Sequence, residues 1–248
     1  GFCLVGSEMC IRDSFLADSL QSATDTLFYI YHNNQSATAY ASSSPYGSQA
    51  VWSGYEAVYH FNDDPSVVVY DQTGKGRNLL PAVGTAATTS GQLGTALDLT
   101  GGSIMIEDAD WTWQAGDDLI SSGWYFQSTI DTGALWQFGD NPGGGNDPGY
   151  VEYMPWYDST DRGYSRFGVT SGADFRFDRD GTIWHHFTTI GRADIGQTNF
   201  IYDNNIQRDS VVQTVSNPTN TGLKLGRYQT GTYMNIIIDE LRFATNTR

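Results

Sequence analysis

Short runs of β-branched and aromatic residues recur between turn signals along the chain from Ser53 onward. In "DFRFDR" (174–179), Phe175 and Phe177 fall on one face of a strand and Arg176 and Asp178 on the other, because strand side chains alternate. "VYHF" (58–61) and "IIIDELRF" (236–243) carry apolar residues on both faces, which predicts interior strands covered on each side. This rhythm predicts an all-β sandwich or barrel.

A helical pattern is confined to one short segment, "SFLADSLQSA" (14–23). The glycine-rich "GDNPGGGNDPGY" (139–150) predicts a long turn, because aromatic, strand-like runs flank it closely. Small and polar residues in "ASSSPYGSQA" (41–50) indicate a domain boundary. The chain from residue 51 to 248 is then long enough for one large β-sandwich with a substantial core.

The stretch "CLVGSEMCIRDS" (3–14) resembles nothing else in the chain and holds both cysteines. It back-translates into a transposase adapter used in sequencing libraries, read in an unintended frame. We therefore interpret residues 1–14 as a sequencing-adapter artefact and exclude them from fold reasoning. The alternative is a natural, irregular N-terminus. Either interpretation predicts that this chain is a piece of a longer protein.

The chain is strongly acidic, with a formal net charge of -15 and only two lysines, Lys75 and Lys224. It has no basic stripe that would neutralise phosphates, so nucleic acid and anionic membrane surfaces are not expected partners. No run approaches the roughly 18 apolar residues that a membrane-spanning helix needs, so no membrane insertion is expected of this chain. Without the first 14 residues no cysteine remains, which excludes disulfides and a cysteine nucleophile.

The order of the strand-like segments carries a resemblance to a known family. The segments are "YEAVYHFNDD", "DQTGKGRNL", "GQLGTALDLTGGSIMIED", "SGWYF", "GTIWHHFTTI", "NFIYDN", "LKLGR" and "IIIDELRFA". In this order they resemble the laminin-G-like, concanavalin A-like jelly roll of bacterial secreted proteins, over residues 52–248. The resemblance implies two antiparallel sheets packed face to face, with the first strand, "YEAVYHF", next to the last, "NIIIDELRF".

A second resemblance lies upstream, in "ATDTLFYIYHNNQSATAYASS" (23–43). It is similar to the closing strand of a small bacterial β domain of unknown function that precedes such jelly rolls. Residues 15–50 are therefore expected to be the C-terminal remnant of that domain plus a linker. Some proteins of this arrangement resemble extracytoplasmic extensions of proton-channel subunits of the ExbB/TolQ/MotA type, which implies a periplasmic or extracellular location.

The residues argue against an enzyme. Laminarinase-type glycosidases share the jelly roll, and their retaining chemistry needs two carboxylates about 5 Å apart. Their Glu-x-Asp-x-x-Glu pattern is absent, and Asp239 and Glu240 are consecutive on a predicted strand, so they are expected on opposite faces. A Gly-x-Ser-x-Gly nucleophile elbow is absent as well.

Two adjacent histidines, His185 and His186, invite a metal interpretation. Adjacent strand residues point to opposite faces, so they cannot both reach one ion. In the family pattern "WHHF" is a structural core strand, with Trp184 packed inside, and Trp124 is expected in the core as well.

A structural calcium ion is a candidate cofactor, because the turns are rich in the oxygen ligands that calcium prefers. Asp63 and Asp64 follow the first predicted strand, and Asp239 shares a predicted face with apolar residues of the last. If these strands are adjacent, the three carboxylates form the candidate metal site. The alternative is that Asp239 pairs with His60 or with the strand beside Arg242, and that the other aspartates only cap turns.

Exposed aromatic rings among hydrogen-bonding side chains predict a sugar-binding surface. The predicted loop 152–166 and the segment 108–118 carry such rings. The candidate ligand-binding residues are Trp156, Tyr157, Arg162, Tyr164, Trp111 and Trp113, and Asp158 and Asp161 lie among them. The alternative is that these rings cover the ends of the sandwich as ordinary packing.

The leading hypothesis is a non-catalytic, lectin-like binding or adhesion module of a larger secreted or envelope-anchored bacterial protein, with a glycan or another envelope component as ligand. A structural spacer without its own ligand is the first alternative. A divergent glycan-cleaving enzyme is the second.

Overall fold

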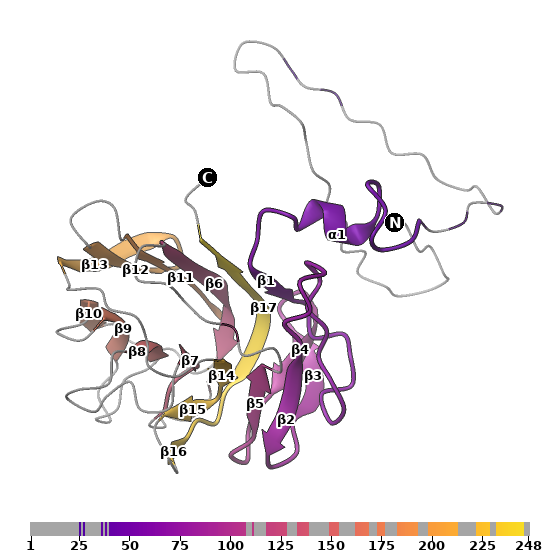
Figure 1. The fold of residues 1–248 in the computed structure, drawn as a ribbon. Coiled ribbons are helices and arrows are strands. Elements are labelled where there is room, and N and C mark those ends of the chain that lie inside the picture. The colour runs from indigo at the N-terminus through magenta and orange to yellow at the C-terminus, as the bar shows by residue number, and fades with distance from the viewer. Residues whose placement is uncertain are drawn as a thin grey trace.

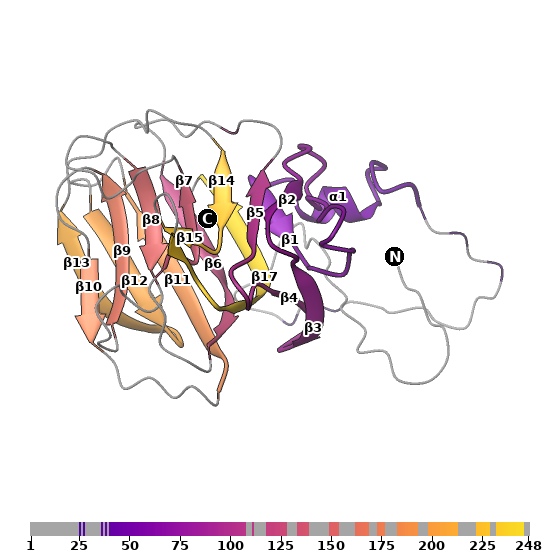
Figure 2. The same cartoon turned by 90° about the horizontal axis from the view of Figure 1, so that it is seen from below.

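A computed structural model of the chain describes residues 25, 27, 36, 38, 40–107, 111, 118–127, 133–138, 149–153, 162–168, 173–176, 183–192, 198–212, 222–228 and 232–245. Almost all of the regular structure in these ranges is β-strand, and the single helix there is the four-residue α1 (Ser48–Val51). Two antiparallel sheets lie face to face (Figures 1 and 2) and enclose one apolar core. This confirms the predicted all-β, two-sheet sandwich.

The first sheet has eight strands, of which seven follow one another in the order β13-β12-β11-β6-β17-β4-β3, while β1 pairs with β17. Their bounds in that order are β13 (Ile206–Val212), β12 (Thr198–Asp203), β11 (His185–Gly191), β6 (Leu119–Phe126), β17 (Ile237–Ala244), β4 (Gly94–Asp98), β3 (Ala87–Gly91) and β1 (Ala57–Tyr59).

The second sheet has seven strands in the order β10-β9-β8-β7-β14-β5-β2, and β15 and β16 form a separate two-stranded ribbon. The bounds are β10 (Ala173–Arg176), β9 (Arg162–Gly168), β8 (Gly149–Tyr153), β7 (Trp136–Phe138), β14 (Leu223–Leu225), β5 (Ile104–Glu107), β2 (Leu79–Val83), β15 (Arg227–Tyr228) and β16 (Thr232–Tyr233).

Strand β17 pairs with β1 on one side, as the resemblance to the jelly roll implied for the first and last strands. Ala57 lies opposite Phe243, and Tyr59 lies opposite Leu241. The pairing extends before β1, because the Glu56 N–H donates to the Phe243 carbonyl at 2.8 Å. The opening and closing segments of the sandwich are therefore joined in one sheet.

The core takes the inward-facing residues of both sheets. Along β6 and β11, buried and half-buried residues alternate strictly, as expected for strands with one face on the core. Phe243 of β17 lies at the centre of the core, with its ring centroid 5.4 Å from that of Trp136 and 6.1 Å from that of Phe138. The last strand thus anchors the first sheet to the second.

A β-bulge interrupts the pairing of β17 with β6. Asp239 lies opposite Trp124 and Arg242 lies opposite Ser122, so two residues of β17 face the single Gly123 between them. Glu240, one of the two, has a φ of 53°. A Cβ on Gly123 would lie only 3.3 Å from both the Asp239 carbonyl oxygen and the Leu241 Cα, so glycine accommodates the close approach.

The bulge corrects the prediction that Asp239 and Glu240 point to opposite faces. Cross-strand partners project from the same face of an antiparallel sheet, so Asp239 shares the outer face with Trp124. Glu240 lies on that face too, beside Trp124 and Arg242. Leu241 and Phe243 point into the core instead of sharing a face with Asp239.

The short helix α1 lies next to β1 and outside the two layers (Figure 1). No helix in the described ranges combines the length and the apolar character that crossing a membrane requires. Residues 1–14, interpreted above as an adapter artefact, lie outside the described residues. The predicted boundary between residues 50 and 51 stays a prediction.

Replacing Phe243 by alanine tests the central position of β17 in the core. We expect Phe243→Ala to lower the free energy of unfolding by about 3–5 kcal/mol, because it leaves a cavity among the packed rings. The matched control is Tyr70→Ala, which removes a ring that is 52% exposed, and it should change the free energy of unfolding by about 0.5 kcal/mol or less. Urea unfolding of both variants measures this, and equal losses would contradict the assignment.

Candidate functional site

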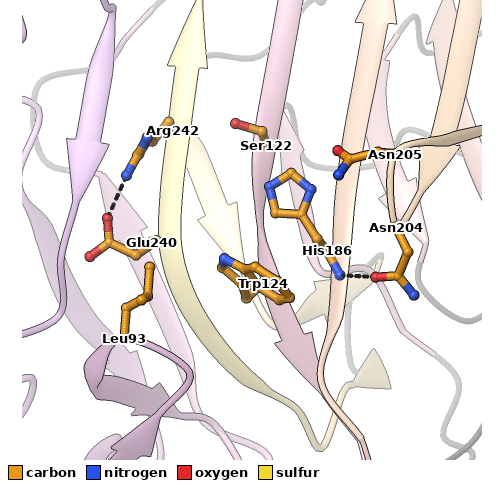
Figure 3. Close-up of a pocket in the computed structure, with 8 residues that line it drawn as sticks. All are labelled: Leu93, Ser122, Trp124, His186, Asn204, Asn205, Glu240 and Arg242. Atoms are coloured by element: carbon orange, nitrogen blue, oxygen red, sulfur yellow. Dashed lines mark hydrogen bonds and ion pairs between the residues drawn. The ribbon is translucent and has the colours of Figure 1, made fainter.

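A pocket opens on the outer face of the first sheet, with a volume of about 520 Å³ (Figure 3). Strands β6, β11 and β17 form its floor, and the β3–β4 and β12–β13 turns form its two ends. The lining residues are Leu93, Ser122, Trp124, His186, Asn204, Asn205, Glu240 and Arg242.

The floor of the pocket is aromatic. Trp124 and His186 are cross-strand partners on β6 and β11, and both are half-buried on the outer face. Their ring centroids are 4.9 Å apart in a T-shaped arrangement, with an interplanar angle of 68°. This edge-to-face geometry is favourable for aromatic pairs and fixes the indole in the floor.

One end of the pocket holds an ion pair. The Arg242 guanidinium donates to Oε2 of Glu240 at 2.8 Å, which Figure 3 marks as a dashed line. Nδ1 of His60 lies 2.9 Å from both oxygens of the same carboxylate. The Glu240 side chain is 4% exposed, so these two partners compensate a nearly buried charge.

Trp52, just upstream of β1, supports this ion pair from behind. Its ring centroid lies 5.1 Å from the guanidinium carbon of Arg242 and 5.3 Å from the centroid of His60. The first distance is within the range of a cation–π interaction. Trp52 is 8% exposed, so the segment before β1 packs beside the ion pair of Glu240 and Arg242.

The opposite end of the pocket is a tight turn between β12 and β13. Asn204 and Asn205 have φ values of 49° and 65°, as in the two-residue hairpin turns that asparagine favours. The backbone N–H of Asn204 donates to the His186 carbonyl at 2.7 Å, and its side-chain Oδ1 accepts from the His186 N–H at 2.9 Å. These bonds hold the turn against β11 and leave Asn205 exposed at the rim.

The β3–β4 turn is held by Asp239. Its Oδ2 accepts a hydrogen bond from the Leu93 N–H at 2.7 Å, and the residue is fully buried. A Cβ on Gly91 would lie 2.5 Å from this oxygen, so the turn needs glycine for its close approach. Asp239 therefore positions Leu93 at the pocket and does not itself line it.

The environment of His186 lowers its pKa. Burial is the largest cause, and the positive charge of Arg242 adds to it, while Asp203 acts in the opposite direction. His186 is therefore uncharged at neutral pH. Its Nδ1, like Nε of Arg242, is buried without a hydrogen-bond partner among the described residues.

Of the six sequence-predicted ligand residues, the three that the structure describes, Arg162, Tyr164 and Trp111, do not line this pocket. Trp156, Tyr157 and Trp113 lie outside the described residues. Arg162 and Tyr164 lie on strand β9 of the second sheet, which corrects their assignment to a loop.

Trp111 is corrected as well. It is 6% exposed, and its ring packs 4.8 Å from Phe138 and 5.6 Å from Phe243, centroid to centroid. The Arg77 guanidinium carbon lies 4.0 Å from its ring centroid. Trp111 is thus a core residue covered by an arginine, and its faces are not available to a sugar ring.

The structure also corrects the expectation that Trp124 and Trp184 are core residues. Both are half-buried on the outer face, and the Trp184 ring lies 5.7 Å from that of Phe126. The inward histidine is His185, which is buried, stacks on Tyr125 at 5.3 Å and pairs with Asp203 at 3.2 Å. Sequence reasoning therefore missed Trp124 as a pocket residue.

The three candidate metal ligands are held by separate partners. Asp63 accepts from the Tyr70 N–H at 2.9 Å, Asp64 accepts from the Ser66 N–H at 3.0 Å, and Asp239 accepts from Leu93. Within the described ranges, no group of three His, Cys, Asp or Glu residues is placed to hold a metal ion. The calcium ion stays a prediction.

The fold places this chain among β-sandwich domains, and comparison with solved structures gives it relatives of that class. No protein-family model matches the chain, and no curated protein matches it either. Domain 4 of AbnA, a GH43 extracellular arabinanase from Geobacillus stearothermophilus solved with arabinotriose, superimposes with a TM-score of 0.60 and 20% identity, over 77% of this chain and 92% of that domain.

Two further solved structures share the fold. The binding domain of Paraclostridial Mosquitocidal Protein 1 has a TM-score of 0.55 and 14% identity, over 79% of this chain and 49% of that one. Trypanosoma rangeli sialidase in complex with sialic acid has a TM-score of 0.53 and 12% identity, over 77% of this chain and 31% of that one. This chain thus spans about half of the mosquitocidal binding domain and about a third of the sialidase.

The lowered pKa of His186 predicts a pH dependence of stability. As the pH falls, His186 of the unfolded chain takes up a proton near pH 6.5, whereas in the folded chain it does so only at a lower pH. The contribution of His186 to the unfolding free energy is therefore present above pH 6.5 and is lost as the pH falls toward the lowered pKa of the folded chain. We expect the wild type to lose unfolding free energy more steeply than His186→Gln between about pH 8 and pH 5. Urea unfolding across this range measures the difference.

A direct NMR titration of the His186 ring protons serves as the control. A midpoint at or above the ordinary histidine pKa of 6.5 would contradict the argument.

Proposed function

We propose that this chain is a non-catalytic, lectin-like module that binds a glycan in the pocket around Trp124. The single observation that carries the proposal is the half-buried indole of Trp124, framed by Glu240 and Arg242 at one end and by two asparagines at the other. Ligand sites combine an aromatic surface with a few placed polar groups in this way, and the pocket volume of about 520 Å³ suits a short oligosaccharide.

The chemistry of the lining residues supports a polyhydroxylated ligand. The indole offers an apolar surface for the C–H face of a sugar ring, while amide, hydroxyl and guanidinium groups donate to and accept from its hydroxyls. Nδ1 of His186 and Nε of Arg242 add two polar atoms without a partner in the described part of the chain. Buried polar atoms normally have one, in protein, water or ligand.

The structural neighbours support a carbohydrate ligand in general and do not bear on its charge. The arabinanase domain was solved with arabinotriose and the sialidase with sialic acid. At 20% and 12% identity these likenesses share the fold with this chain and carry no residue assignments.

The carboxylates around the pocket favour binding over catalysis. Glycoside hydrolysis commonly uses a pair of carboxyl groups on the two sides of the scissile bond. Within the described part of the chain, Glu240 is the one carboxylate that lines the pocket, and it is already engaged by Arg242 and His60. Asp239 lies under the β3–β4 turn with no exposed surface.

The resemblance to jelly rolls of bacterial secreted proteins supports an extracellular or periplasmic setting, within a larger secreted or envelope-anchored protein. The net charge of -15 disfavours nucleic acid as the partner. A glycan of the environment or of the cell envelope is the partner that this setting offers.

Replacing the indole tests the proposal. We expect Trp124→Ala to weaken binding of the best glycan on an array by about 30-fold or more, because an aromatic anchor in the centre of a site is typically worth about 2 kcal/mol. Isothermal titration calorimetry measures the loss. The matched control is Trp184→Ala, which removes a half-buried indole from the same face outside the pocket and should leave the affinity unchanged.

Three outcomes would count against the proposal. Equal losses in both variants would show that the pocket is not the site. A wild-type chain that binds no glycan would favour the structural spacer, and turnover of a polysaccharide by the purified chain would favour the enzyme.

A further inference from the structure

Building on the proposed glycan-binding function, we infer that the pocket selects uncharged glycans and rejects those that present a carboxylate or sulfate group to Arg242. The inference rests on how the fixed charges around Trp124 are paired. It names the class of glycan, which the proposed function leaves open.

Arg242 is the one arginine or lysine among the described residues that line the pocket. Its guanidinium donates to Glu240 at 2.8 Å and lies 5.1 Å from the centre of the Trp52 ring. The side chain is still 30% exposed, so it can donate further hydrogen bonds to a ligand while its charge is balanced within the protein.

An anionic ligand group would contact both members of the ion pair between Arg242 and Glu240. A ligand carboxylate that reached Arg242 would also approach the Glu240 carboxylate. Glu240 lines the pocket and accepts a hydrogen bond from the same guanidinium. Two like charges bound to one guanidinium repel, and among the described residues that line the pocket no other arginine or lysine offsets the repulsion. A sugar hydroxyl at the same place accepts from Arg242 without this cost.

The compensated carboxylate of Glu240 also disfavours a cationic ligand. An ammonium group of an amino sugar needs an uncompensated carboxylate, but both oxygens of Glu240 lie 2.9 Å from Nδ1 of His60, and one also accepts from Arg242. The carboxylate is 4% exposed and has little surface left for a ligand cation.

The remaining polar groups of the pocket carry no charge. Ser122, Asn204 and Asn205 are neutral, and the lowered pKa of His186 keeps its ring neutral at pH 7. Neutral donors and acceptors at one end and a balanced ion pair at the other match a ligand whose recognition groups are hydroxyls.

Matched oligosaccharide pairs test the inference on the wild-type chain. The probes are lactose with sialyllactose, and xylotetraose with its glucuronate-substituted form, measured by calorimetry at pH 7. In the pair that binds, we expect the neutral member to bind at least about tenfold more tightly than the acidic one. Its affinity should change by less than about twofold between about 50 mM and 500 mM NaCl, because no net charge is neutralised on binding.

The variant Glu240→Gln tests the cause. It keeps the shape of the side chain, removes its charge and leaves Arg242 unbalanced, so the affinity of the acidic member relative to that of the neutral member should rise about tenfold. The matched control is Glu56→Gln, which removes the same charge from an ion pair with Lys75 and Arg77 away from the pocket. It should alter neither affinity.

The outcomes separate this inference from the proposed function. A wild-type chain that prefers the acidic members, or a Glu240→Gln variant whose preference equals that of the wild type, would overturn the inference and leave glycan binding standing. A wild-type chain that binds no glycan on a broad array would overturn the proposed function itself. The wild-type pairs decide the question even if Glu240→Gln does not fold.

Discussion

The pairing of β17 with β1 on one side and with β6 on the other is the constraint on which the rest of the structure depends. Leu241 and Phe243 must point inward to fill the core, which leaves Arg242 between them on the outer face. The bulge opposite Gly123 then turns both Asp239 and Glu240 outward. One irregularity in one central strand therefore supplies the pocket with its ion pair and fixes the turn that forms its wall.

Each carboxylate on this face is compensated by at least one group from a distant part of the chain. Asp239 accepts from the backbone of Leu93, and Glu240 is held by His60 and Arg242, with Trp52 behind them. A nearly buried charge without such partners would be costly, so these contacts and the fold require each other. The pocket is consequently held in shape before any ligand arrives, which reduces the entropy that binding costs.

The alternation of apolar residues along the chain was sufficient for the all-β fold class, and the resemblance of the ordered segments to a jelly roll implied the pairing of the end strands. The sequence was not sufficient for the site. "SSGWYF" fits a strand with either aromatic inside, and only packing decides that Tyr125 is buried and Trp124 is not. Strict alternation separates Asp239 from Glu240, whereas the positive φ of Glu240 and the missing Cβ of Gly123 break that alternation. Trp111 reads as a loop residue, but it fills the core against Phe138.

The central claim is that the ligand meets the outer face of the first sheet, at Trp124. The most direct measurement is a ¹H–¹⁵N NMR titration of the chain with the glycan that it binds best on an array. We expect the indole N–H of Trp124 and the backbone amides of His186 and Arg242 to shift with ligand, while the indole N–H of the buried Trp111 does not. Shifts confined to the amides of Arg162 and Tyr164 on β9, with the Trp124 signal unchanged, would contradict it.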